Sequence, residues 1–288
     1  MKKLPPKVRN IIFAVVLIAA VVSFVYENYI REPVTVEGEI NIHAIDVGQG
    51  DSTLIVAPEG NLLIDAGTNS SEDDLLEYLD YHGIDTIDYL ILTHPHEDHI
   101  GGADAVVENC SVKNVIMTSF AVTGRVYDDL LDALDKSAET SVIECRAGAE
   151  YAVGEMKIKL LGPDPAELGD DANNSSIITK ITYGESSLLF TGDAETSVEK
   201  RLIIQWGQQL DCDFLKMGHH GSSTSNCDDF IDAVSPYMSV VSCGKDNSYG
   251  HPHREIVSML KTRNIEYYRT DKDGSIVFIC DGEKIVKK

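Results

Sequence analysis

The segment Thr93-His94-Pro95-His96-Glu97-Asp98-His99 places three histidines and an aspartate within six positions, directly after the largely apolar stretch 87–92. A stretch of that length is typical of a buried strand, so the cluster is expected at a strand end. Imidazole and carboxylate groups suit zinc, manganese or iron. His94 and His96 stand two apart and can bind one ion, and Asp98 and His99 can reach a second. The segment therefore predicts a two-metal site.

Three other predicted strand ends carry side chains that a two-metal site needs. Asp193 follows one strand in the turn Thr191-Gly192-Asp193, where it can bridge two ions. His219 and His220 follow a second strand, and His251 follows a third. Each has an ordinary structural alternative: Asp193 can cap a helix, either of the adjacent histidines can pack in the core, and His251 can be a surface loop residue.

Residues 39–288 predict one α/β domain with mixed sheets in two similar halves. Strands are expected at 40–45, 52–56, 62–65, 87–93, 112–117, 141–145, 156–161, 176–183, 187–190, 213–217 and 237–242, and helices between Ser71 and Gly83 and at 103–109, 126–136, 196–206 and 255–263. The tail, 267–286, is expected to close as a small meander with two Asp-Gly turns. Neither a G-x-G-x-x-G fingerprint nor a Walker loop occurs, which counts against dinucleotide and ATP chemistry.

The chain is strongly acidic, with a formal net charge of -23. The residues after position 31 hold 19 basic and 46 acidic side chains. Such a surface repels nucleic acid on average, so a polyanion must be met by a local patch or by metal ions. The charge counts against a nonspecific DNA-binding module and leaves a metal-dependent phosphodiesterase open.

The N-terminus has the pattern of a membrane signal. Residues 1–10 carry four basic side chains and are expected in the cytoplasm, 11–26 contain no charge and predict a transmembrane signal anchor, and 27–38 form a linker. A helix of 16 residues reaches roughly 24 Å, somewhat less than the hydrocarbon core of about 30 Å. This predicts a single-pass membrane protein whose domain lies outside the cytoplasm. A cleaved signal, which would give a secreted protein, and a buried helix of the domain are the alternatives.

The six cysteines are scattered without a C-x-x-C pair. This pattern indicates neither a zinc ribbon nor a dense disulfide framework. Buried free thiols are expected at the cysteines in apolar stretches, such as Cys280. One or two bridges remain open for an exported domain.

These motifs together resemble the metallo-β-lactamase superfamily, and within it the metallohydrolase domain of ComEC-type DNA-uptake proteins. The resemblance covers about residues 40–285. It rests on the segments Asp46-Val47-Gly48-Gln49-Gly50-Asp51-Ser52, Leu62-Leu63-Ile64-Asp65-Ala66-Gly67, Thr93 to Gly102, Asn173-Asn174-Ser175-Ser176, Phe190-Thr191-Gly192-Asp193, Lys216-Met217-Gly218-His219-His220-Gly221-Ser222 and Asn247-Ser248-Tyr249-Gly250-His251-Pro252. It implies an αββα sandwich that binds two divalent metal ions, zinc or manganese, at the edge between its sheets.

The sequence departs from that family pattern in two respects. Most members have a histidine at the third motif, where this chain has Asn173-Asn174. An amide oxygen is a harder and weaker ligand than imidazole, so the first site is expected to favour manganese or to be only partly filled. The sequence also predicts a single membrane span instead of the multi-pass channel region of ComEC-type proteins, so the chain is not expected to form a DNA channel itself.

The resemblance implies roles for individual residues. His94, His96, Asp98, His99, Asp193, His220 and His219 are the candidate metal ligands; of the last two, His220 is favoured and His219 is then a neighbouring packing residue. Asp98 is expected to bind metal or steer a metal-bound hydroxide, His251 to protonate the leaving oxygen, and Lys245 to hold a phosphate. Asp65, Asp51 and Asn174 are expected around the ligands, with Asp65 orienting a ligand histidine.

The favoured function is a metal-dependent hydrolase that cleaves phosphodiester bonds and acts as a nuclease-like enzyme. One alternative is a hydrolase of another substrate class, namely a phosphorylcholine ester, a lactone or a β-lactam. The other is a non-catalytic metal-binding module of a DNA-uptake or envelope assembly. The expected partners are a nucleic acid or another phosphodiester and the cytoplasmic membrane, with no obligate protein partner indicated.

Overall fold

The structure is a computed structural model that describes residues 36–288 and, in the N-terminal segment, residues 8, 12–13, 15–19 and 21. The chain divides into two units, Met1–Val34 and Thr35–Lys288, which are described separately. The predicted basic N-terminus, membrane anchor and linker lie largely outside the described residues. Among the residues described, no helix combines the length and the apolar character that a membrane crossing requires.

The larger unit contains two mixed β-sheets. Within residues 36–288 the first sheet has eight strands in the order β15-β14-β1-β2-β3-β4-β5-β6. Their bounds are β1 Ile40–Ala44, β2 Thr53–Ala57, β3 Gly60–Ile64, β4 Thr86–Ile91, β5 Ser111–Met117, β6 Ser141–Glu144, β14 Ile276–Cys280 and β15 Ile285–Lys287. Strands β3 to β6 run parallel to one another, and the other pairs in this sheet are antiparallel.

The second sheet has seven strands among the same residues, in the order β13-β12-β11-β10-β9-β8-β7. Their bounds are β7 Glu150–Val153, β8 Met156–Gly162, β9 Ile178–Tyr183, β10 Ser186–Phe190, β11 Phe214–Lys216, β12 Met238–Val241 and β13 Glu266–Arg269. Strands β10 to β13 are parallel, so the loops that follow β10, β11 and β12 emerge at one edge of the sheet.

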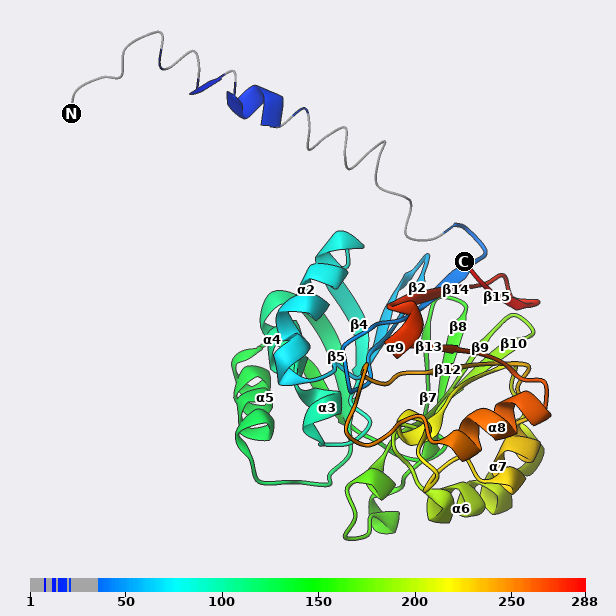
Figure 1. The fold of residues 1–288 in the computed structure, drawn as a ribbon. Helices are drawn as coiled ribbons and strands as arrows, with labels where there is room; N and C mark the ends of the chain where they lie inside the picture. The colour runs from blue at the N-terminus through cyan, green and yellow to red at the C-terminus, as the bar shows by residue number, and fades with distance from the viewer. Residues whose placement is uncertain (1–7, 9–11, 14, 20, 22–35) are drawn as a thin grey trace. The chain divides into compact units, whose positions relative to one another are not determined.

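Helices cover the outer faces of both sheets (Figure 1). Beside the first sheet lie α2 Glu72–Tyr81, α3 Glu97–Ile100, α4 Ala103–Asn109 and α5 Arg125–Lys136, and beside the second lie α6 Thr196–Trp206, α7 Asp228–Val234 and α8 Arg254–Thr262. The short helix α9 Thr270–Asp273 connects β13 to β14. This architecture confirms the expected αββα sandwich.

The core lies between the sheets because both inner faces are apolar. Phe214 of β11 and Phe278 of β14 meet edge to face with ring centroids 5.0 Å apart, joining one sheet to the other. Both rings are fully buried, and burial of a phenylalanine side chain contributes about 1.5–3 kcal/mol each. A second apolar cluster, which includes Leu202 and Phe230, packs α6 and α7 against the outer face of the second sheet. The two layers of packing fix the strand ends that carry the site.

The chain's tail differs from the predicted meander. Strand β13 joins the second sheet parallel to β12, whereas β14 joins the first sheet antiparallel to β1. The alternate residues Ile276, Phe278 and Cys280 of β14 are buried in the core between the sheets, which draws this strand away from β13. The Asp281-Gly282 turn does form a hairpin, between β14 and β15. The prediction of a separate meander was therefore wrong for its first half.

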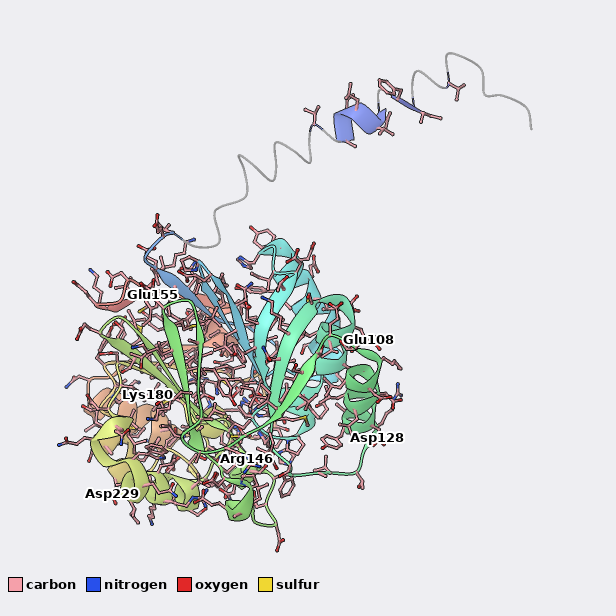
Figure 2. The ribbon with its side chains drawn as sticks, turned by 180° about the vertical axis from the view of Figure 1, so that it is seen from behind. Glu108, Asp128, Arg146, Glu155, Lys180 and Asp229 are labelled. Carbon is pink, nitrogen blue, oxygen red and sulfur yellow. The ribbon has the colours of Figure 1, made fainter. Side chains whose placement is uncertain are left out.

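Acidic side chains project outward from both helical layers. Figure 2 shows Glu108 of α4, Asp128 of α5 and Asp229 of α7 at the surface, and all three are exposed. The six cysteines, all within the described residues, are free, and four of them are buried, namely Cys145, Cys212, Cys243 and Cys280. The expectation of buried free thiols is confirmed for these four.

Candidate metal centre

The histidine cluster begins where β4 ends at the edge of the first sheet. The chain turns at Pro95, and α3 starts at Glu97 with His96 as its N-cap residue in an extended conformation (φ -71°, ψ 148°). The amide of His99 donates to the carbonyl of His96 at 3.0 Å, which closes this turn. A short loop followed by one helical turn thus directs the ligand candidates into one space.

Four residues from three loops form a compact ligand group. Asp98, His99, Asp193 and His220 each offer one atom, and these atoms all lie within 4.8 Å of one another. Nε2 of His220 lies 3.1 Å from Oδ2 of Asp98 and 3.6 Å from Oδ2 of Asp193. Nε2 of His99 lies 3.3 Å from Oδ1 of Asp193. We call this group the second site.

Of the other two histidines of the cluster, His94 approaches the same aspartate and His96 contacts His94. Nε2 of His94 stands 3.0 Å from Nδ1 of His96 and 3.9 Å from Oδ2 of Asp193. We call His94, His96 and Asp193 the first site. Oδ1 of Asp193 faces His99, and its Oδ2 is approached by both His94 and His220, so this one carboxylate lies next to imidazoles of both sites.

The residues of the second site fit a divalent metal ion. Nε2 of His99 and Oδ1 of Asp193 are buried, and neither has a hydrogen-bond partner in the part of the chain described. Buried polar atoms are almost always satisfied, so two that converge on one space indicate a missing partner. A set of imidazoles and carboxylates is the donor chemistry of zinc, manganese and iron sites.

The electrostatics of the second site keep its carboxylates ionised. Burial alone would raise the pKa of Asp98, but the hydrogen bond from His220 and the charges of His99 and His220 lower this pKa to about 2. Burial likewise opposes charge on His220, yet Asp193 and Asp51 raise its pKa to about 10. In the absence of metal, protons on the imidazoles thus balance the carboxylates, and a divalent cation would replace those protons.

Two buried carboxylates outside the ligand set orient the ligand histidines. Oδ2 of Asp65 lies 2.7 Å from Nδ1 of His99, and Oδ1 of Asp65 accepts a hydrogen bond from the amide of Thr93 at 2.7 Å. Nδ1 of His220 is hydrogen-bonded to the carbonyl oxygen of Ser242 at 3.1 Å, and Oδ1 of Asp51 lies 3.1 Å from the same nitrogen. In each pair the other ring nitrogen, Nε2, faces the site. Such carboxylate–imidazole pairs fix the tautomer and raise the basicity of a metal-binding histidine.

The ligand groups open into a cleft of about 600 Å³. The cleft is lined by Gln49, Thr68, His96, Glu97, Asp98, Asn173, Asp193, His219, His220, Tyr249 and His251. His251 stacks between His220, at a centroid distance of 6.1 Å, and Tyr249, at 5.6 Å. Tyr249 is 66% exposed, so this stack of rings leads from the second site to solvent.

The structure places two further residues with predicted roles, His251 and Lys245, differently with respect to the cleft. His251 lines the cleft, and in the protein without metal, burial and the neighbouring His220, His253 and His219 lower its pKa to about 4; its role as the acid stays a prediction. Lys245 is exposed and is not among the residues that line the cleft.

The side chain of Asn174 lies beside the start of α6. Its Oδ1 accepts a hydrogen bond from the amide of Glu195 at 3.1 Å, just before α6. The cleft is lined instead by Asn173, its neighbour in the 3₁₀ helix Asn173–Ser175.

Two residues near the site were missed by reasoning from the sequence. Lys216 is buried at the end of β11 and its Nζ lies 2.6 Å from Oδ2 of Asp51. A lysine within the apolar stretch Phe214-Leu215-Lys216-Met217 was a signal that could have found it, because buried lysines are normally paired. Tyr249 carries no such signal, since exposed loop tyrosines are common.

Comparison with protein families and relatives agrees with this geometry. The family described as the Metallo-beta-lactamase superfamily matches residues 45–245. ComE operon protein 3 of Bacillus subtilis (strain 168) is 32% identical over 84% of this chain and 33% of its own length. Competence protein ComA of Neisseria gonorrhoeae is 30% identical over 92% of this chain and 35% of its length. Recombination protein 2 of Haemophilus influenzae is 30% identical over 82% of this chain and 28% of its own length. The chain spans about a third of the length of these relatives.

Solved structures share the fold at low sequence identity. The metallo-beta-lactamase fold protein YhfI from Bacillus subtilis has a TM-score of 0.57 and 14% identity, with 84% of this chain and 99% of that chain covered. Igni18, a metallo hydrolase from Ignicoccus hospitalis, has a TM-score of 0.52 and 12% identity, with coverages of 83% and 98%. At such identities the likeness extends to the fold.

Proposed function

This chain belongs to the metallo-β-lactamase superfamily, and from this membership we propose that it is a metal-dependent hydrolase that cleaves phosphodiester bonds. The observation that carries the proposal is the position of Asp193 between two groups of imidazoles. An arrangement with two ions suits in-line displacement at phosphorus, because the attacking and leaving oxygens can both be stabilised. Two of the relatives are named for competence and recombination, which are processes that handle nucleic acid.

The residues that would hold the ions follow from the two sites. His94, His96 and Asp193 would bind the first ion, and Asp98, His99, Asp193 and His220 the second. Zinc or manganese bound there would supply an acidified water as nucleophile and neutralise charge on the phosphoryl oxygens. The buried Asp65 and Asp51 would hold the ring nitrogens of His99 and His220 in place during the reaction.

Other side chains would act on the substrate from the cleft. The Asp98 side chain is 30% exposed, so it can both bind metal and accept a hydrogen bond from the attacking water. His251, which lines the cleft, would protonate the leaving oxygen. Lys245 would reach a phosphate only on a substrate that extends beyond the cleft. The acidic surface favours a substrate held mainly through metal ions and ring contacts.

The cellular setting proposed here rests on the N-terminal pattern. Four basic residues before the uncharged run 11–26 support a signal anchor with the domain outside the cytoplasm. A phosphodiester substrate would then be met outside the cell membrane. The substrate and the membrane are the only partners in this proposal.

Hydrolysis by the purified full-length chain in detergent tests this function. With manganese or zinc, the chain is expected to cleave single-stranded DNA or bis-p-nitrophenyl phosphate and to leave a lactone and nitrocefin intact. His96→Ala and Asp193→Asn should each lower the rate by at least about 10²-fold. The matched change His82→Gln should keep it, because His82 packs against His43 and Tyr78 and is not among the residues that line the cleft. Hydrolysis of the lactone or nitrocefin alone would replace the phosphodiester with another substrate class, and no hydrolysis by metal-loaded protein would favour a binding module.

A further inference from the structure

We propose that His219 is the third imidazole ligand of the first site and takes the place of the histidine that the third motif lacks. This inference rests on the two-ion site of the proposed function and assigns to the first site the adjacent histidine that the sequence pattern favours less than His220. Without it, the first site has two imidazoles and one shared carboxylate. The third motif of this chain supplies only the amide of Asn173 to the cleft.

The position of the His219 ring suits an ion of the first site. Its Nε2 lies 3.6 Å from Oδ2 of Asp193, and Nε2 of His94 lies 3.9 Å from the same oxygen. Two ligand atoms that each lie about 2.1 Å from a tetrahedral ion are roughly 3.4 Å apart. Both observed separations are close to this ligand-to-ligand distance. Nε2 of His220 also lies 3.6 Å from this oxygen, but it lies 3.1 Å from Oδ2 of Asp98 in the second site, which leaves His94 and His219 as the pair that we assign to the first ion.

The other nitrogen of His219 is held as in the other ligand histidines. Nδ1 of His219 lies 3.2 Å from the hydroxyl oxygen of Thr224, which leaves Nε2 directed at Asp193. The rings of His99 and His220 are oriented in the same way, since each has Nδ1 beside a carboxylate and Nε2 facing the site. A ring that only packed would not need this orientation.

The backbone explains how two adjacent histidines can face one site. In an extended segment, neighbouring side chains point to opposite sides. His219 (φ 50°, ψ 49°) and His220 (φ 52°, ψ 25°) are both left-handed, a conformation that costs a non-glycine residue about 1–2 kcal/mol. Two consecutive residues of this kind sharply turn the chain, and the amide of His219 is fixed by the carbonyl of Gly192 at 3.0 Å. Backbone strain of this kind concentrates at functional sites.

Asn173 is the competing ligand for the same position. Its Oδ1 is buried and has no hydrogen-bond partner among the described residues, and the side chain lines the cleft. An amide oxygen is a weaker ligand for zinc than an imidazole nitrogen. Substituting His219 and Asn173 one at a time distinguishes them, because only substitution of the true ligand should lower the metal content.

Metal content tests the assignment without relying on activity. The full-length chain would be dialysed against buffered manganese or zinc, and its metal content and affinity measured by elemental analysis and calorimetry. The wild type is expected to hold two ions. His219→Gln should retain only the ion of the second site, because the affinity of the first site should fall at least 10-fold. His253→Gln and Asn173→Ala should each hold two ions. Circular dichroism and the retained second ion would show that the variants are folded.

A cobalt-loaded His219→Cys variant provides a spectroscopic test that does not depend on the glutamine variant's folding. If residue 219 binds metal, this variant should show a thiolate-to-cobalt charge-transfer band that the wild type lacks. Two ions at wild-type affinity in His219→Gln, or one ion in the saturated wild type, would overturn the proposal, as would the absence of the cobalt band. Loss of an ion in Asn173→Ala alone would assign the ligand to the amide. A wild type that binds two ions through His219 without cleaving a phosphodiester would refute only the proposed function.

Discussion

Asp65 holds His99 in place, with Oδ2 of the carboxylate 2.7 Å from Nδ1 of the ring. The ring consequently presents Nε2 to Asp193 at 3.3 Å. Asp65 itself is left-handed (φ 59°) and also accepts hydrogen bonds from the amide and hydroxyl of Thr93. One buried carboxylate therefore fixes both the end of β4 and a ligand of the second site.

Asp65→Asn is expected to weaken metal binding while keeping the fold. Asparagine tolerates the left-handed conformation and can still accept a hydrogen bond from the Thr93 amide, but it removes the negative charge beside His99. Loss of such a partner typically costs 10–100-fold in metal affinity. Calorimetric titration with zinc or manganese would measure the change, and unchanged affinity would show that Asp65 only supports the backbone.

Asp51 and Lys216 are expected to be strongly coupled in stability. Nζ of Lys216 lies 2.6 Å from Oδ2 of Asp51, and both side chains are buried. Removing one partner of a buried pair costs about 3–5 kcal/mol because the other charge is left unpaired. The double variant Lys216→Met/Asp51→Asn should therefore lose less stability than the sum of the losses of the two single variants. Urea unfolding of the two single variants and the double variant measures this coupling, and additive free energies would rule it out.

Gly50→Ala is expected to disturb the second site through the backbone. A Cβ at Gly50 would lie 2.5 Å from the carbonyl oxygen of Asp98, so the loop that carries this ligand must move. We expect the variant to lower both the melting temperature and the affinity for the second ion. Gly169→Ala is the matched control, because nothing lies within 4 Å of its Cβ and its φ is not in the left-handed range. Equal effects of the two substitutions would contradict the explanation.

His43 is expected to make stability depend on pH away from the metal site. Burial, together with the nearby charges of His82 and Lys288, lowers the pKa of His43 to about 3 from 6.5. The unfolded chain therefore takes up a proton first as the pH falls. The contribution of neutral His43 to the free energy of unfolding is complete above pH 6.5. It is lost as the pH falls toward 3, at up to about 1.4 kcal/mol per pH unit.

The comparison of wild type with His43→Gln isolates this effect. Glutamine can keep a hydrogen bond to the hydroxyl of Tyr78, which lies 2.8 Å from Nδ1 of His43, and it does not titrate. Urea unfolding at pH 7.5 and pH 5.5 should show a larger loss in the wild type than in the variant. Equal losses would mean that other groups govern the acid response.

Much of the fold and part of the site could be predicted from local patterns. The helix predicted at 103–109 is α4 and the helix at 196–206 is α6, with identical bounds, because apolar periodicity and the flanking turns are encoded locally. The short spacing within 94–99 likewise keeps those side chains together in any fold that has a strand before them. The candidate ligands His94 to His99 were found for this reason, and their roles remain predictions.

The tertiary structure decided which distant residues meet. His220 and Asp98 are separated by 122 positions, and Lys216 and Asp51 by 165, yet each pair is in direct contact. No periodicity encodes such contacts, because they follow from how two sheets stack and where their strand ends fall. The left-handed turn at His219 and His220, and the division of the tail between both sheets, have the same origin. The sequence by itself determined the elements and the metal-binding chemistry of one loop, and packing between the sheets decided the geometry of the site.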